Sequence, residues 1–482
     1  MLPQHLIQTR RGRHDNLDKA ETDRISELPD DILSLIILNF TPRDAANASV
    51  LSRKWRRLCA LCTPYLDFDW YTMFRGLNNS AIWWNGQIDL CQQYKDLFVR
   101  GVNQFIQFYN GAEVLMFQVS FCLNRDSSSD IDRWVSFAAS RGVKGLVLNL
   151  SCFKFILPEN RNKGNELYIF HPALLSQGQV SKLNYLWLHS CILGEGLTDQ
   201  FISLKVLKLV NVSLRDQVQR VLSCCSVLNS ITLADCSLPV NLCIPGSLHC
   251  LNSLEITSCI GVQKIELFAS SLTSFKYYGY LIEFSFSQVP NLEKVYLGAE
   301  NVDEVHKIFS QIAKDLPLVK TLSFLFASAS WLQGLREHIT PFRKVQQLEL
   351  FSPRKTNFDT QNMISILRAC PLLQQFCLVI RSVEYYDQGE MLEPTECVIH
   401  EHLKKVEISG FFGTWSQIEF AIYLLKYGVA LEQMVIVPRF SFSIGRNRYV
   451  SGKRMSWDEG EREMVCERLQ GYPKSAVVIL NN

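Results

Sequence analysis

The stretch that decides the fold is residues 183–261, in which one short pattern is written four times. The copies are Leu183–Leu193 (LNYLWLHSCIL), Leu204–Leu214 (LKVLKLVNVSL), Leu228–Leu238 (LNSITLADCSL) and Leu251–Gly261 (LNSLEITSCIG). Each copy runs as an apolar residue, two variable residues, an apolar residue, one variable residue, an apolar residue, two variable residues and then often Cys. Apolar residues that alternate in the middle of each copy are typical of a short strand.

The same pattern continues on both sides of this stretch. Counted by the first apolar residue, the copies begin at Val143, Leu183, Leu204, Leu228, Leu251, Leu272, Leu292, Val319, Val345, Leu373, Leu403 and Leu431. From Leu183 onward the intervals are 20 to 30 residues long. The longer first interval contains the polar segment 158–164, which we interpret as an inserted surface loop. This period and this spacing of apolar residues are the signature of leucine-rich repeats.

A leucine-rich repeat supplies one short parallel strand and a return segment, and it buries its apolar side only against its neighbours. The sequence therefore predicts an α/β solenoid with a curved parallel sheet along its concave wall and helices outside. The later repeats are longer, which leaves room for full helices such as 303–314 and 360–370. Cys191, Cys236 and Cys259 fall at the turn after the strand, where they need no reactive role.

The variable residues around the last two apolar positions of each copy are predicted to point into the concave space, because side chains alternate across a strand. Tyr and Trp dominate the energetics of many interfaces. The residues predicted to bind a target protein are Tyr185, Trp187, His189, Lys208, Lys276, Tyr278, Lys294 and Tyr296. Val206, Val210, Glu349 and Phe351 are expected on the same wall. The alternative is that these are ordinary exposed side chains, which every protein surface carries.

Charge and hydropathy exclude several classes of protein. The 482 residues include 49 Lys and Arg against 47 Asp and Glu, a formal net charge of +2. This balance argues against a protein that wraps nucleic acid or coats an anionic membrane. The chain has no apolar run long enough to span a bilayer and no apolar signal-peptide core. We therefore expect it in the cytoplasm, the nucleus or both, with its 16 cysteines reduced.

Motifs for catalysis and metal binding are missing from the sequence. The pair Cys59-Ala-Leu-Cys62 has no second pair at zinc-site spacing, and His400-Glu401-His402 lacks the spacing of a helical zinc motif and is interpreted as a solvated loop. We find neither a Gly-rich phosphate loop nor a nucleophile motif. The sequence predicts no metal, no cofactor and no enzyme activity of its own.

Residues 23–62 carry the start signals of three short helices. In the segment 28–37, Pro29 suits the first helical turn, and the Asp30 and Asp31 carboxylates favour the positive end of the helix dipole. A second start lies at Thr41-Pro42-Arg43-Asp44, and residues 51–58 are predicted to form a third helix. Such a unit buries little surface and is expected to complete its core against something else. Residues 1–22 are predicted to be a disordered tail, with a nuclear-targeting signal at 10–13 as the alternative.

This helical unit resembles the F-box of plant F-box proteins, with DRISELPDDILSLIILNF at 23–40 and PRDAANASVLSRKWRRL at 42–58. In that family the motif docks a Skp-type adaptor, which bridges to a cullin scaffold in an SCF ubiquitin ligase. Position by position, the resemblance assigns adaptor binding to Leu28, Pro29, Ile32, Leu33, Ile36, Val50, Leu51 and Trp55. Asp31 in place of the commoner Glu, and Phe40 in place of the usual Leu, depart from the family pattern. The alternative for Leu28, Ile32 and Trp55 is a purely internal packing role.

The end of the chain resembles the FBD region of plant F-box/leucine-rich-repeat proteins. It reads as a strand from 403, a helix at 419–426 and a strand at 431–436, with Gly410 and Gly413 between the first two. In that family the region closes the repeat array. The segment 439–457 is rich in Arg, Ser and Gly and is predicted to be a mobile loop. The predicted organisation is a tail (1–22), an F-box (23–62), a linker (63–94), a leucine-rich-repeat solenoid (95–399) and an FBD region (400–482).

These resemblances imply a substrate-recognition subunit of an SCF-type ligase, whose F-box docks the adaptor while the repeats bind a target protein. Two alternatives stay open at this point. One is an interaction scaffold that binds the adaptor without forming a ligase. The other is a small-molecule receptor like the hormone co-receptors among F-box/leucine-rich-repeat proteins, although no Arg cluster recurs at the concave positions to hold an anionic ligand.

Overall fold

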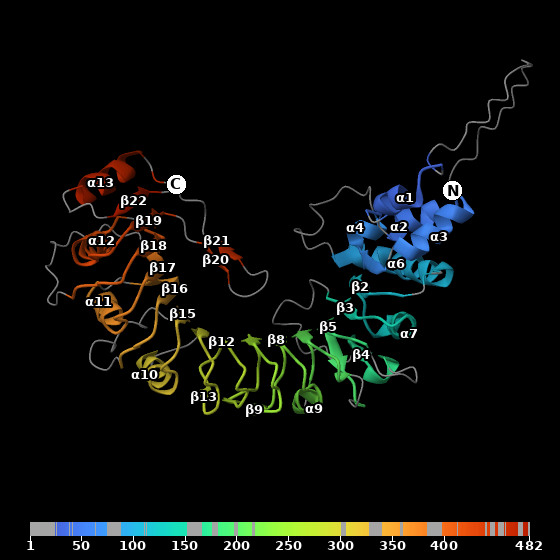
Figure 1. The fold of residues 1–482 in the computed structure, drawn as a ribbon, viewed down its shortest axis with the longest axis horizontal. Coiled ribbons are helices and arrows are strands. Elements are labelled where there is room, and N and C mark those ends of the chain that lie inside the picture. The colour runs from blue at the N-terminus through green and yellow to red at the C-terminus, as the bar shows by residue number, and fades with distance from the viewer. Residues whose placement is uncertain are drawn as a thin grey trace, which may run out of the picture.

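Alternating apolar residues build a long parallel sheet, which a computed structural model shows as the concave wall of a horseshoe (Figure 1). The structure describes residues 25, 27–37, 39–40, 42–62, 64–74, 88–109, 111, 113–151, 166–175, 182–196, 201–214, 217–299, 305–326, 340–356, 360–382, 398–411, 413–438, 441–443, 449–451, 457, 459–470 and 476–480. The predicted tail and the polar insertion at 158–164 lie outside these residues. Within the described ranges, no helix combines the length and the apolar character needed to cross a membrane.

The main sheet contains fifteen strands among the described residues, and every pair of neighbours is parallel. In spatial order they are β1 (Tyr65–Asp69), β2 (Met116–Ser120), β3 (Gly145–Asn149), β5 (Tyr185–His189), β7 (Val206–Val210), β8 (Ser230–Ala234), β10 (Ser253–Thr257), β12 (Ser274–Gly279), β14 (Lys294–Ala299), β15 (Thr321–Phe326), β16 (Gln347–Thr356), β17 (Gln375–Ser382), β18 (Lys405–Ser409), β19 (Gln433–Val437) and β22 (Val477–Leu480). Spatial order follows chain order, as a solenoid requires. The predicted fold class is confirmed.

The turn after the strand repeats from one unit to the next. Ser190, Asn211, Asp235 and Ser258 occupy the same position, and each has a positive φ of 51 to 60°. Their backbone N–H groups donate to the following repeat, for example from Asn211 to Ala234 and from Asp235 to Thr257. The Cys236 and Cys259 thiols next to these turns donate to backbone carbonyls of the preceding strand. The predicted turn position of the cysteines is therefore confirmed.

The convex side changes character along the chain. The later repeats carry α10 (Val305–Asp315), α11 (Thr360–Arg368) and α12 (Trp415–Tyr427), as their length predicted. The short middle repeats instead close with small parallel strands, so outer helices were a wrong expectation there. Those strands are β6 (Cys191–Leu193), which pairs with β4 (Tyr168–Phe170) of the longer repeat before it, and β9 (Asn241–Ile244), β11 (Lys264–Leu267) and β13 (Glu283–Ser285). A repeat of only 20 to 23 residues has too little chain for a helix after the strand and its turn.

The N-terminal end of the solenoid corrects the predicted linker at 63–94. Strand β1 lies inside that segment and pairs with β2, and α4 (Trp70–Met73) follows it directly. Helix α6 (Ile88–Phe108) also begins before the predicted boundary at 95. Aromatic rings close this end of the core: the Phe98 and Phe121 rings stack at 4.2 Å, and Trp70 lies 4.8 Å from Phe74. The repeat array is thus joined to the F-box almost without a spacer.

The connections between the remaining strands fill both arms of the horseshoe. The other described helices outside the F-box are η1 (Arg125–Ser127), α7 (Ser128–Ser140), η4 (Pro172–Leu175), α9 (Gln217–Cys224) and α13 (Glu459–Leu469). At the C-terminal arm, β18 and β19 extend the main sheet, so the FBD-like region continues the solenoid as its last repeats. The predicted loop at 439–457 contains the antiparallel pair β20 (Ser441–Ser443) and β21 (Tyr449–Ser451), which lies on the concave side of this arm (Figure 1).

Candidate adaptor and target surfaces

The F-box has a small core of its own, separate from the core of the solenoid. Its helices are α1 (Asp30–Ile37), α2 (Pro42–Ser49) and α3 (Arg53–Cys62). The buried side chains are Leu33, Ile37, Ala45, Ala48, Trp55, Leu58 and Cys59, with Leu28 and Phe40 packed against them. The Phe40 ring stacks on Trp55 with centroids 6.1 Å apart, so the larger residue at position 40 fills this core.

Polar contacts fix α3 against the start of α1. The Asp30 carboxylate pairs with Lys54 at 3.2 Å and with Arg57 at 2.7 Å, and the Lys54 ammonium also donates to the Leu28 carbonyl at 2.7 Å. The acidic first turn of α1 is therefore stabilised by the basic residues of α3 as well as by the dipole of α1 itself. These charges are partly exposed, so they orient the helices more than they stabilise them.

A cluster of exposed apolar side chains lies on the outside of the F-box. Exposed fractions are 44% for Ile32, 60% for Leu35, 37% for Ile36, 74% for Val50 and 68% for Leu51. Ile36 and Leu51 also line one hollow, which they share with Asn39, Phe40, Asp44, Asn47 and Ala48. Clustered exposed apolar groups of this kind mark interaction sites. We call Ile32, Leu35, Ile36, Val50 and Leu51 the apolar F-box surface.

The structure separates the adaptor residues predicted from the sequence into two groups. Pro29, Ile32, Ile36, Val50 and Leu51 are exposed, and Leu28 is half-buried. Leu33 is fully buried and Trp55 is only 4% exposed, so both belong to the core and their assignment to the surface is corrected. Leu35 was missed, although its spacing of three residues from Ile32 places it on the neighbouring helical face.

The concave wall consists of three rows of side chains that run across the strands. The central row includes Trp187, Lys208, Thr232, Glu255, Lys276, Tyr296, Ser323, Glu349, Cys377 and Glu407, as the register of the strands shows. Tyr185, Val206 and Lys294 belong to the row on one side, and His189, Val210, Tyr278 and Phe351 to the row on the other. All the residues predicted to line this wall therefore do so. Their part in binding a target stays a prediction.

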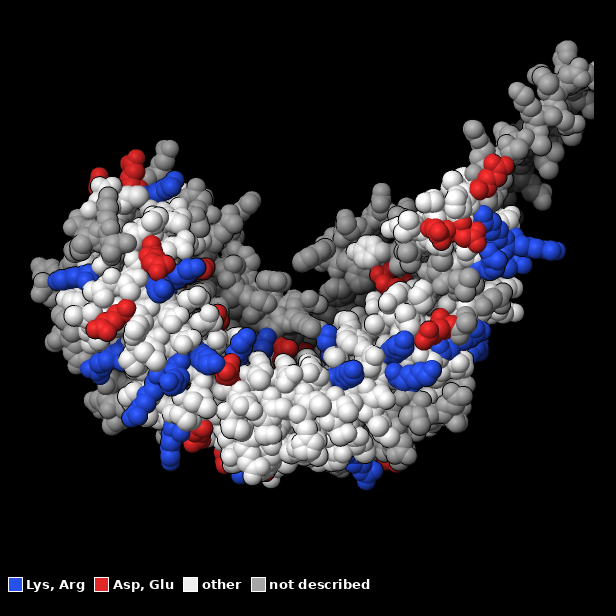
Figure 2. Space-filling model, viewed as in Figure 1, with Lys and Arg blue, Asp and Glu red and all other residues white. Residues whose placement is uncertain are grey.

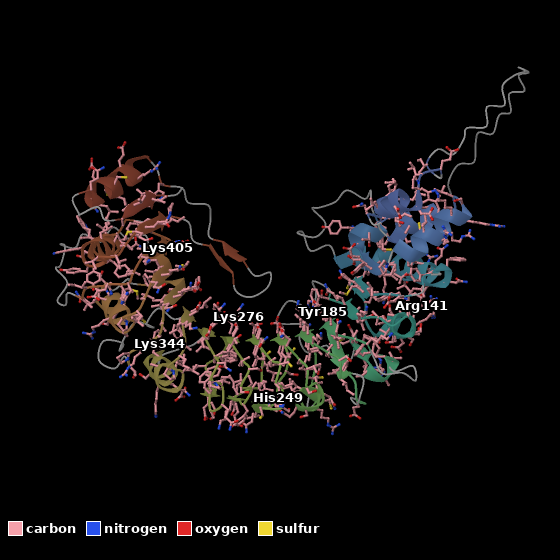
Figure 3. All side chains as sticks on the ribbon, viewed as in Figure 1. Arg141, Tyr185, His249, Lys276, Lys344 and Lys405 are labelled. Atoms are coloured by element: carbon pink, nitrogen blue, oxygen red, sulfur yellow. The ribbon has the colours of Figure 1, made fainter. Side chains whose placement is uncertain are left out.

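One hydrogen-bonded group on this wall surrounds Lys208, which is only 9% exposed. Its ammonium donates to the Tyr185 hydroxyl at 3.1 Å. The same nitrogen lies 5.3 Å from the centre of the Tyr185 ring and 5.4 Å from that of Trp187. These distances are those of cation–π contacts. Figure 3 labels Tyr185 on the side of the ribbon that faces the opening of the horseshoe.

The neighbours of Lys208 differ in their charge. Burial lowers the pKa of His189 to about 4, so its imidazole is neutral at pH 7. Lys276 pairs with Glu255 at 3.1 Å, which neutralises both groups. Lys294, two strands further on from Glu255, is exposed. From β5 to β14 the central row thus holds three charged side chains: Lys276 and Glu255 pair with each other, and Lys208 has no ion pair among the described residues.

In the C-terminal half, the central row carries Glu349 and Glu407, and Lys405 is exposed in the row beside them. Burial and the charge of Glu407 raise the pKa of Glu349, against a hydrogen bond from Ser323 that lowers it. Burial, together with Glu407 and Glu349, raises the pKa of Cys377 to about 12, so this thiol is protonated and unreactive at neutral pH. Burial, and then the charge of Glu349, also raise the pKa of the Tyr296 hydroxyl.

The residues that we considered as metal ligands have structural roles. His400 is 7% exposed and its Nε2 lies 3.0 Å from the Tyr423 hydroxyl, so the interpretation of residues 400–402 as a solvated loop is wrong for His400. Cys59 is buried in the F-box core. In the part of the chain that the structure describes, no group of three or more His, Cys, Asp or Glu side chains is placed to hold a metal ion.

Comparison with known proteins agrees with this architecture. The family model for the F-box domain matches residues 25–67, and the model described as "At1g61320/AtMIF1, LRR domain" matches residues 107–461. Similar proteins from Arabidopsis thaliana include the F-box/LRR-repeat protein At5g38396, 24% identical over 94% of this chain and 97% of the relative, and the putative F-box/FBD/LRR-repeat protein At4g03220, 25% identical over 93% of each. The putative F-box protein At3g58860 is 24% identical over 87% of this chain and 90% of its own length. With its F-box, its solenoid and these relatives, the chain belongs to the plant F-box/leucine-rich-repeat proteins.

Proposed function

We propose that the chain is the substrate-recognition subunit of an SCF-type ubiquitin ligase and works where such ligases do, in the cytoplasm, the nucleus or both. The observation that carries this proposal is the apolar F-box surface. Its five side chains are exposed although the F-box already has a closed core of its own. Exposed apolar groups that the fold does not need are stabilised by a partner, and a Skp-type adaptor is the partner that an F-box generally docks.

The mechanism is proximity, and no residue of the chain performs chemistry. The F-box holds one end of the horseshoe on the cullin assembly while the repeats hold the target. Figure 1 shows the F-box at the tip of one arm, so an adaptor bound there leaves the concave wall open to a target. Lysines of a bound target are thereby kept at high effective concentration near the charged conjugating enzyme.

The proposal is tested by the affinity of the purified chain for a Skp-type adaptor. Ile36→Asp and Leu51→Asp each place a carboxylate in the apolar F-box surface, and each is expected to weaken adaptor binding by about tenfold or more, because a charge buried without a partner costs more than 1.4 kcal/mol. The matched control is Val240→Asp, an equally apolar side chain that is 54% exposed on the solenoid. Thermal unfolding of each variant verifies that it is folded.

Two results would contradict the adaptor surface. One is the absence of adaptor binding by the unmodified chain, and the other is an equal loss in all three variants. Adaptor binding without recruitment of cullin would favour the interaction scaffold over the ligase subunit.

A further inference from the structure

Lys208 carries a charge that the fold shields from water and does not neutralise. Only 9% of the residue is exposed, and its ammonium contacts the Tyr185 hydroxyl and the faces of two aromatic rings. Among the described residues, no carboxylate lies within ion-pair distance of its ammonium. A buried cation without a counter-charge is costly, since the interior solvates it poorly. Lys276, three strands beyond Lys208 along the central row, has such a counter-charge in Glu255.

A second hydrogen-bond donor at the same place is also unsatisfied. The indole Nε1 of Trp187 is buried and has no hydrogen-bond partner. Trp187 and Lys208 are direct neighbours in the register of β5 and β7, so their side chains leave the sheet side by side on the concave wall. Buried donors in native proteins nearly always have an acceptor. A cation and an N–H group that both lack an anionic acceptor point to a ligand that supplies one.

We infer that Tyr185, Trp187 and Lys208 form a carboxylate-binding subsite for an acidic segment of the target protein. The Lys208 ammonium binds an Asp or Glu carboxylate of that segment, and the Trp187 N–H donates a hydrogen bond to the same group. The inference rests on the proposed function only in naming a target protein as the source of the carboxylate.

The surroundings of the subsite favour an anion at this place on the wall. The Tyr185 and Trp187 rings exclude water and thereby strengthen the attraction between the ammonium and a carboxylate. Glu255, the next carboxylate along the central row toward the C-terminus, is paired with Lys276, so it repels an acidic segment only weakly. Glu349 and Glu407 lie on β16 and β18, far along the central row from Lys208, and repel an acidic segment there. Figure 2 shows both Lys or Arg and Asp or Glu side chains along the floor of the opening, above a broad face with few charged residues.

The test measures binding of fluorescein-labelled peptides to the full chain in complex with the Skp-type adaptor, by fluorescence anisotropy without cullin. The probe is a ten-residue peptide of alternating Glu and Ala, compared with Gln/Ala, Lys/Ala and phosphoserine/Ala peptides of the same length. We expect the Glu/Ala peptide to bind at least tenfold more tightly than the Gln/Ala and Lys/Ala peptides. Lys208→Met keeps the length of the apolar stem and should weaken Glu/Ala binding at least tenfold, while Lys208→Arg should retain most of it.

The matched control is Lys205→Met, which removes the same charge from an exposed side chain just before the same strand. It should change the affinity less than threefold. Trp187→Phe keeps an aromatic ring and removes only the N–H group, so it should weaken binding about threefold to tenfold, and it provides a second test if Lys208→Met fails to fold. Equal losses in the Lys208→Met and Lys205→Met variants would overturn the subsite, as would equal binding of the Glu/Ala and Gln/Ala peptides.

A phosphoserine/Ala peptide that binds while the Glu/Ala peptide does not would also overturn the carboxylate assignment. Because cullin is absent from this measurement, its result is independent of ligase assembly. Lys208→Met should still assemble with the adaptor and cullin as the unmodified chain does, so the failure of the subsite and the failure of the proposed function are distinguishable.

Discussion

At the scale of single residues, burial distinguishes the core residues of the F-box from those of the apolar F-box surface, which the sequence pattern alone does not distinguish. Leu33 and Ile36 lie on the same short helix and are both apolar, yet Leu33 is fully buried and Ile36 is 37% exposed. Apolar character alone predicts neither role, because an adaptor surface and a core use the same side chains. The helical position relative to Trp55 and Leu58 decides which one each residue has.

This distinction predicts opposite effects of two alanine substitutions. Leu33→Ala should reduce the free energy of unfolding of the F-box by about 2–5 kcal/mol, because it leaves a cavity. Ile36→Ala should leave stability within about 0.5 kcal/mol and weaken adaptor binding. Local proteolysis of the F-box and adaptor affinity measure the two effects. An F-box that is destabilised equally by both substitutions would contradict the assignment.

Asp67 on β1 gives a pH-dependent prediction at the same scale. Burial, and then the charge of Asp69, raise the pKa of its carboxyl from 3.8 to about 6, and its Oδ1 has no hydrogen-bond partner. Between these two values the folded chain binds the proton that the unfolded chain has lost, so this group lowers stability as the pH rises through that window. Asp67→Asn should therefore raise the unfolding temperature by about 1–2 °C at pH 7.5, a small shift because the site is partly solvated. The difference should vanish near pH 3.5, and an unchanged difference across this range would contradict the account.

At the scale of single elements, the turns after the strands fix the register of the repeats. Gly410 follows β18 directly and has a φ of +77°, and a Cβ at this position would collide with the Ile380 carbonyl oxygen of the preceding repeat. Gly196 also has a positive φ, of +96°, but nothing lies within 4 Å of its Cβ position. Both glycines therefore have a backbone conformation that favours glycine, but only Gly410 also has a backbone atom of a neighbouring repeat too close for a Cβ.

Alanine substitutions at these glycines should differ for that reason. Gly196→Ala carries only the cost of a left-handed conformation, about 1–2 kcal/mol. Gly410→Ala adds the collision with backbone, which cannot yield as a side chain would, and should lower the unfolding temperature of the C-terminal repeats distinctly further. Thermal unfolding of the two variants side by side measures the difference. Equal shifts would show that the contact with Ile380 is not decisive.

How far the sequence predicts these elements depends on whether a strand carries the leucine pattern. The strands of the main sheet from β3 to β19 follow it and were predicted, together with the direction of their side chains. Strand β1 has the sequence YLDFD, in which Leu66 and Phe68 alternate with Asp67 and Asp69. Asp disfavours strands, so propensity does not reveal this strand, which forms by pairing with β2. The subsite at Lys208 likewise required the register, because no pattern in the sequence tells which charges are paired.

At the scale of the whole molecule, the F-box and the solenoid share a boundary with almost no spacer. The F-box core and the solenoid core are separate, but α2 packs against β1, α4 and α6. The edge strand β1 and the aromatic residues after it cover the end of the sheet. The solenoid thus needs residues 65–74 as a cap, which repeat arrays generally require for solubility.

Truncation should locate this boundary. A chain that begins at residue 64 retains β1 and should remain a soluble monomer. A chain that begins at residue 75 lacks β1, Trp70 and Phe74, and it exposes the edge of β2 with Phe98 and Phe121, so it should associate through that edge. Size-exclusion chromatography with light scattering compares the two masses. Two monomeric products would contradict the capping role of β1.

The measurement that tests the central claim most directly is the mass of the assembly formed when the chain is mixed with a Skp-type adaptor and a cullin. The account predicts a single species that contains one copy of each, which the Leu51→Asp variant fails to form and the Val240→Asp variant forms normally. Failure of the unmodified chain to join adaptor and cullin in one species would contradict a role as a ligase subunit.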